Sequence, residues 1–87
     1  MPIEVRKPTP DEEADMRTCP TWEKEASTFP WHYDEQETCL ILQGEVEVTS
    51  ADQTVSFGPG DYVVFPQGLD VTWHVKKPVR KHYRFGE

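Results

Sequence analysis

The residues of this sequence that could do chemistry gather where a short polar bend meets a β-prone run. The bend WHYDEQE, residues 31–37, carries one histidine and three carboxylates and ends at Glu37. The run from Thr38 to Val48 is apolar, β-prone and broken by a single glycine. Further along, alternation within Val79 to Phe85 places Lys81 on the apolar face of that segment. A lysine that faces a core is costly unless it is paired or functional.

Composition limits the classes of function. The 87 residues suffice for one small domain, which oligomerisation would help to stabilise. The net charge of -7 and the shortness of the only basic cluster, residues 76–84, argue against a nucleic-acid partner, because duplex binding needs a contiguous cationic surface. No apolar run approaches the ~20 residues of a membrane-spanning helix. Since no signal-peptide pattern occurs at the N-terminus, we expect a cytoplasmic protein with Cys19 and Cys39 as reduced thiols.

The spacing of apolar residues predicts one short helix and six to eight short strands. Residues 3–6 alternate like an edge strand, and Thr9, Pro10 and Glu12 form a capping-box start for a helix that ends near residue 16. Further strands are expected at residues 21–29, 38–49, 54–57, 61–65, 71–76 and 79–85. Gly44 should bend or split the longest strand, and Pro30 should interrupt the pairing so that a new segment begins after it.

This punctuation by glycine and proline predicts an all-β fold, an antiparallel sandwich or barrel with jelly-roll connections. No repeat and no linker divides the chain. We therefore expect a single domain over residues 1–87, with a strand and the helix in residues 1–20 and the barrel in residues 21–85.

Two segments resemble the sequence motifs of the cupin superfamily. Glu37, six further residues and Gly44 match the end of the first motif, G(x)5HxH(x)3-4E(x)6G. Gly60, five further residues and Pro66-Gln67-Gly68 match the start of the second, G(x)5PxG(x)2H(x)3N. The resemblance implies a double-stranded β-helix, which is a jelly-roll barrel of two antiparallel sheets. It also implies that Glu37 points into that barrel.

The metal ligands of the cupin motifs are mostly replaced in this sequence. His32 matches the second histidine of the first motif, but Pro30 occupies the place of the first, and Val71 replaces the histidine of the second motif. A divalent transition metal needs three or four ligands. We therefore assign no metal-binding residue. A divalent metal held by a rebuilt set, such as His32, Glu37 and His74, is kept as an alternative.

A narrower similarity spans roughly residues 21–85. The runs WEKEASTFPWHYDEQETCLILQGEVEVT and FGPGDYVVFPQGLDVTWHV, together with PVRKHYRF, resemble small single-domain cupins grouped with the ureidoglycine aminohydrolase and ethanolamine-utilisation protein Q families. Ureidoglycine aminohydrolases are manganese-dependent proteins with two cupin domains. The departures at Pro30 and Val71 count against that activity here.

Within the cupin frame, opposite charges face an apolar interior, where such groups shift pKa and become candidates for acid–base chemistry. We predict Glu37 and Lys81 as catalytic residues. Beside them we predict four substrate-binding residues: Tyr33, Cys39, Trp73 and Trp31. Structural alternatives stay open, since the two charges could simply pair, the cysteine could be inert and the tryptophans could be core. The phenol could also belong to Tyr62.

The favoured hypothesis is a small cupin that binds a small polar metabolite in its barrel pocket and could isomerise or hydrolyse it. One alternative is a metal-dependent enzyme with a rebuilt site. Another is a non-catalytic domain that pairs with itself through its sheet, supported by the outward row Thr38, Leu40 and Leu42. A homodimer is compatible with all three hypotheses.

Overall fold

Seven strands and one helix make up the computed structural model, which describes residues 2–86. Every strand pair in it is antiparallel. In chain order the elements are β1 (Glu4–Arg6), α1 (Pro10–Met16), β2 (Thr21–Lys24), β3 (Ser27–His32), β4 (Glu37–Thr49), β5 (Thr54–Phe57), β6 (Tyr62–Phe65) and β7 (Asp70–Phe85). The predicted all-β fold with one short N-terminal helix is confirmed.

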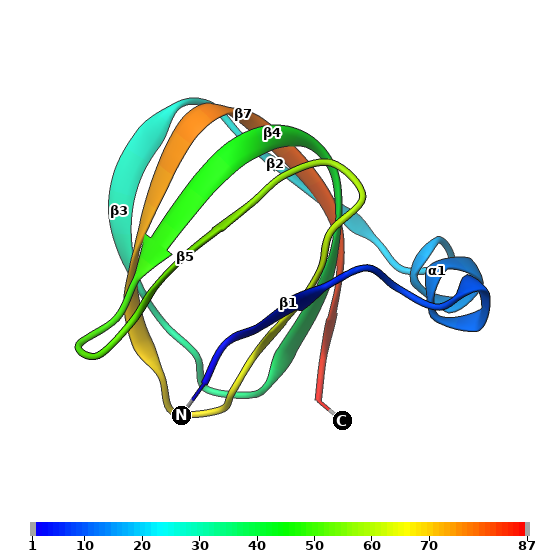
Figure 1. Cartoon of the computed structure of the whole chain (residues 1–87), viewed down its shortest axis with the longest axis horizontal. Helices are drawn as coiled ribbons and strands as arrows, with labels where there is room; N and C mark the ends of the chain where they lie inside the picture. The colour runs from blue at the N-terminus through cyan, green and yellow to red at the C-terminus, as the bar shows by residue number, and fades with distance from the viewer. Residues whose placement is uncertain (1, 87) are drawn as a thin grey trace.

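The two long strands, β4 and β7, organise the barrel. They pair with each other along most of their length, while β5 and β6 pair with β4, and β2 and β3 pair with β7. The N-terminal strand β1 pairs with β6, so the sheet also includes residues before position 21. In Figure 1 the curved strands enclose one interior, and α1 lies outside it on the right.

Gly44 bends β4 and reverses which residues face inward. Its φ of +110° is accessible to glycine, and a Cβ there would lie 2.6 Å from the carbonyl oxygen of Pro78. The pairing with β7 is irregular between Ile41 and Val46, and both of these residues are buried in the same core. An odd-numbered residue faces the core before the bend and an even-numbered one after it. The predicted bend at Gly44 is therefore confirmed.

Three predicted strand boundaries were wrong. Residues 21–29 form β2 and the start of β3, separated by Glu25 and Ala26, rather than one strand. Pro30 does not interrupt the pairing, because it lies within β3 opposite Thr72 of β7. Among the described residues β3 pairs only with β7, so a residue without an N–H is tolerated on this edge strand. Strand β7 likewise continues through Pro78, where a separate last strand was expected.

The helix α1 packs against a small apolar cluster on the outer face of the sheet. Met16 of α1, which is fully buried, packs with Leu40 and Tyr62. Thr38, on the same outward row, is also buried. This row had supported self-association, and that support is weaker because Leu40 is buried with Met16 of the helix and Leu42 is half-buried against the same cluster. In residues 2–86 the seven-residue α1 is the only helix, and it is too short and polar to cross a membrane.

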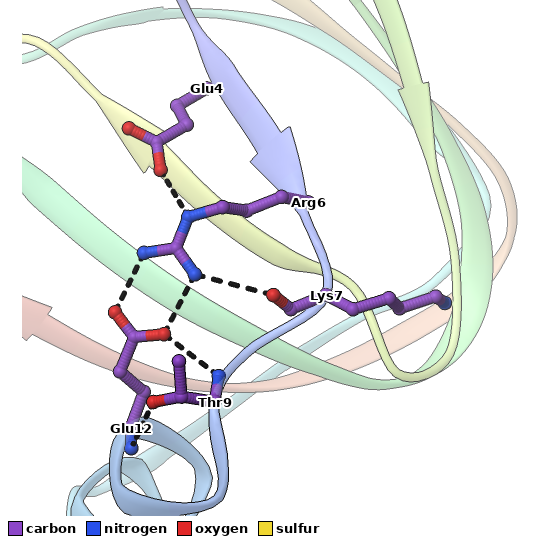
Figure 2. Close-up of polar contacts among 5 residues, drawn as sticks. All are labelled: Glu4, Arg6, Lys7, Thr9 and Glu12. Atoms are coloured by element: carbon purple, nitrogen blue, oxygen red, sulfur yellow. Dashed lines mark hydrogen bonds and ion pairs between the residues drawn. The ribbon is translucent and has the colours of Figure 1, made fainter.

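Polar contacts at the start of α1 hold it to β1. Thr9 accepts a hydrogen bond from the Glu12 N–H, and the Glu12 carboxylate accepts one from the Thr9 N–H, which confirms the predicted capping box. Figure 2 shows the Arg6 guanidinium between Glu4 and Glu12. Arg6 donates two hydrogen bonds, of 2.7 and 2.6 Å, to the Glu12 carboxylate. These bonds, and the backbone bond from Thr9, lower the pKa of Glu12 to about 2.

Candidate functional site

A buried ion pair lies on the inner face of β4 and β7. Lys81 Nζ is 2.8 Å from Glu37 Oε2, and each residue is only 4% exposed. Glu37 begins β4, and Lys81 pairs in register with Ile41, so the two side chains approach diagonally across the paired strands. The inward direction expected for both residues is confirmed. Such a pair withstands burial only when its geometry is good and its remaining polar atoms are satisfied.

Cys39 lies behind the pair with no exposed surface. Its Sγ is 3.3 Å from Glu37 Oε2, to which the thiol donates, and 3.4 Å from Lys81 Nζ. Burial, opposed by the Lys81 charge, raises the pKa of Cys39 to about 12. The side chain is therefore a neutral thiol near pH 7, and it lacks the thiolate character that a nucleophilic cysteine needs.

Lys81 is held as a cation by its surroundings. Burial by itself would lower the pKa of Lys81, but its contacts with Cys39 and Glu37 outweigh that effect and raise it. The ammonium also lies 4.6 Å from the ring centre of Trp73 and 4.9 Å from that of Trp22, which are cation–π distances. An imine-forming lysine needs a lowered pKa, so this environment does not favour that chemistry.

The pair forms part of the wall of a cavity of about 250 Å³. Tyr33 also lines it, and the rest of the lining is aromatic: Trp22, Phe29, Trp31, Trp73, Tyr83 and Phe85. Trp31 is 48% exposed and Phe85 is 47% exposed, whereas Trp73 is only 2% exposed. The cavity therefore combines exposed and buried aromatic side chains with a single pair of opposite charges.

Tyr33 and Trp73 form a second polar contact beside the charges. The Trp73 Nε1–H donates to the Tyr33 hydroxyl oxygen over 2.9 Å, and the Tyr33 ring stacks on Phe65 with 4.8 Å between centres. Burial and the neighbouring Glu37 charge raise the pKa of Tyr33, which keeps the phenol protonated. Tyr62, the other phenol considered from the sequence, belongs to the outer cluster beneath α1. Of the two phenols considered from the sequence, Tyr33 is thus the one that lines this cavity.

Residues 11–83 match the family model described as the EutQ-like cupin domain. This chain belongs to that family. A DUF861 family protein from Thermotoga maritima has 47% sequence identity and a TM-score of 0.91, in a match that covers 97% of this chain and 99% of that one. No curated protein matches the chain at a significant level.

More distant structures share the cupin fold. The EutQ protein of Clostridium difficile has 21% identity and a TM-score of 0.71, and the match covers 76% of this chain and 52% of that one. A cupin superfamily protein from Desulfitobacterium hafniense has 20% identity and a TM-score of 0.64, with 77% and 64% of the two chains covered. This EutQ-like cupin therefore corresponds to about half of the Clostridium protein.

The side chains of this EutQ-like cupin do not fit the usual cupin metal. Pro30 and Val71 cannot donate to a metal at the two replaced positions. His32 is exposed, and its Nδ1 is 2.7 Å from Asp70 Oδ1 on the neighbouring strand. The ammonium of Lys81 lies against Glu37, the surviving carboxylate. Within residues 2–86 no three His, Cys, Asp or Glu side chains are grouped for a metal, so the proposed set with His32 and His74 is not assembled.

Five of the six predicted site residues line the cavity, and one does not. Tyr33, Trp73 and Trp31 lie in the lining together with the two charges. Cys39 lies behind the charges, where it contacts them rather than the open space. The structure thus places a supporting cysteine where a ligand contact was predicted.

Sequence reasoning missed four aromatic residues of the lining: Trp22, Phe29, Tyr83 and Phe85. Alternation with Lys81 had already placed the last two on the inner face of the final strand, so that signal was present. Trp22 and Phe29 have opposite parity in a continuous strand. The break between β2 and β3 brings both rings into one cluster, with centres 6.4 Å apart, and no sequence feature marks that break strongly.

Proposed function

We propose that this EutQ-like cupin binds a small polar metabolite in its barrel cavity, with Glu37 and Lys81 as the polar anchor. The observation that carries the proposal is the position of this pair in the wall of an aromatic cavity. A buried ion pair is weak evidence for a role in stability, because apolar residues of similar volume often serve as well. Most ligand pockets combine apolar walls with a few convergent polar groups, as this one does.

Proton transfer is a second candidate function, favoured by the two inequivalent oxygens of Glu37. Oε2 is held by Lys81 and Cys39, whereas Oε1 has no hydrogen-bond partner within residues 2–86. Because Glu37 lines the cavity, Oε1 is available to accept a proton from a bound molecule. Lys81 would stabilise the anion left on that molecule, and return of the proton to a different atom would complete an isomerisation.

Intrinsic fluorescence offers a direct test, because all three tryptophans of the chain line this cavity. We expect at least one compound in a panel of small polar metabolites to change the emission saturably, and Lys81→Met to abolish the change. Lys77→Met, an exposed substitution on the same strand, is the matched control and should leave it intact. Product formation in the same samples, followed by NMR, would test proton transfer. Binding that is unchanged by both Lys81→Met and Glu37→Gln would refute the proposal.

A further inference from the structure

The charges in the cavity wall are balanced, and this limits what can bind. A cationic ligand would meet the Lys81 ammonium, which already uses Glu37 and the faces of Trp22 and Trp73. An anionic ligand would meet the Glu37 carboxylate beside that ammonium. Because the two charges, 2.8 Å apart, already balance each other, adding either ligand leaves one charge in the cavity uncompensated, which is strongly unfavourable. A ligand without net charge avoids this cost.

Two buried side chains of the lining, Glu37 and Tyr33, each keep an open hydrogen-bonding position, and the two positions are of opposite kinds. Glu37 Oε1 can only accept, so it suits an N–H or O–H of the ligand. The Tyr33 oxygen already accepts from Trp73 Nε1–H, and its own O–H has no acceptor within the described part of the chain. That O–H therefore suits a ligand carbonyl. The raised pKa of Tyr33 keeps the proton in place for this role.

The walls and the volume suit a flat molecule. Phe29 and Trp73 are stacked with an interplanar angle of 12° and 6.1 Å between centres, and Trp22 meets Trp73 nearly edge-on at 70°. Aromatic rings prefer offset-stacked or edge-to-face arrangements with other rings, and a flat ring can adopt these against such walls. An apolar cavity of about 150 Å³ accommodates benzene, so about 250 Å³ leaves room for one ring with substituents or a small fused pair.

From these features we infer that the occupant is an uncharged, planar heterocycle of one or two rings that presents an N–H next to a carbonyl, as a cyclic amide does. Its N–H donates to Glu37 Oε1, and its carbonyl accepts from the Tyr33 hydroxyl. This inference rests on the proposed function, because it names the ligand class of the same cavity.

The test uses three ring compounds of similar size: 2-pyridone, which is neutral, benzoate and benzylammonium. Binding is measured from the indole N–H signals of the three tryptophans in NMR titrations of the full chain. We expect 2-pyridone to bind at least 10-fold more tightly than either charged compound. If a charged compound binds most tightly, the ligand class is wrong but the binding function stands. If none of the three moves an indole signal at millimolar concentration, both proposals are overturned.

Substitutions in the lining should change the preference in opposite directions. Tyr33→Phe removes one donor and should weaken 2-pyridone binding about 5-fold, the contribution of one hydrogen bond. Glu37→Gln leaves a net positive wall and should shift the preference to benzoate, whereas Lys81→Met should shift it to benzylammonium. Thermal unfolding of each variant establishes whether it is folded. If Glu37→Gln and Lys81→Met do not fold, the Tyr33→Phe result decides the test. An unchanged preference in all folded variants would contradict the inference.

Discussion

Removing one member of the Glu37–Lys81 pair should cost far more stability than removing both. Both side chains are 5% exposed, so a single substitution leaves an unpaired buried charge, and breaking such a pair costs about 3–5 kcal/mol. In a domain of this size each 1 kcal/mol lowers the melting temperature by roughly 4–8 °C. Lys81→Met and Glu37→Met should therefore each melt at least about 12 °C below the wild type. The double variant, in which two apolar side chains replace the pair, should melt above both single variants.

The measurement is a double-mutant cycle in urea at neutral pH, with thermal unfolding followed by circular dichroism as a second readout. Arg80→Met is the matched control, because Arg80 is the neighbour of Lys81 in β7 and its contact with Glu23, at 3.4 Å, is exposed. Exposed pairs contribute less than about 1 kcal/mol, so this variant should unfold close to the wild type. The reasoning about the pair is refuted if Lys81→Met unfolds at the same urea concentration as Arg80→Met. It is also refuted if the effects of Lys81→Met and Glu37→Met on the free energy of unfolding simply add in the double variant.

Three further predictions concern the rest of the chain. Gly44→Ala should lower the free energy of unfolding, measured in urea, by about 2 kcal/mol or more, because its Cβ would lie 2.6 Å from a backbone oxygen. Gly86→Ala is the control: with φ +88° and open space around it, it should lose only about 1 kcal/mol. The carboxyl of Glu12 should titrate near pH 2 in carbon NMR rather than near 4.5, so its contribution to holding α1, complete above about pH 4.5, is lost as the pH falls toward 2; a midpoint at 4.5 would contradict the contacts with β1. Cys39, with no exposed surface and a pKa of about 12, should react with a thiol reagent at pH 8 only after denaturation, while the half-buried Cys19 reacts first; equal rates in the folded protein would show that the site opens.

The local features of this fold could be predicted from the sequence. The capping box at Thr9 and the glycine bend at residue 44 follow from backbone chemistry that acts within a few residues, and the structure contains both. Alternation within residues 79–85 placed Lys81 on the inner face, and the structure shows that β7 keeps this parity through Pro78.

Features that depend on distant parts of the chain were harder to predict. Pro30 was expected to end a strand, but whether a proline is tolerated depends on which edge of the sheet lacks a partner, and the local sequence does not specify that edge. The role of Cys39 changed for a similar reason. Cys39 was correctly predicted to face the barrel interior. Only the packed barrel shows that the Glu37–Lys81 pair lies between its sulfur and the cavity.

The central claim is that the buried pair anchors a ligand, and the Glu37→Met/Lys81→Met double variant tests it most directly, because stability is largely restored while the polar anchor is gone. The measurement is a titration of 2-pyridone into the wild type and the double variant, followed through the indole N–H signals of Trp22 and Trp73. We predict a saturable shift of both signals in the wild type and affinity at least 10-fold weaker in the double variant. Equal affinity in the two proteins, with the double variant folded, would contradict the claim and leave the pair with a structural role only.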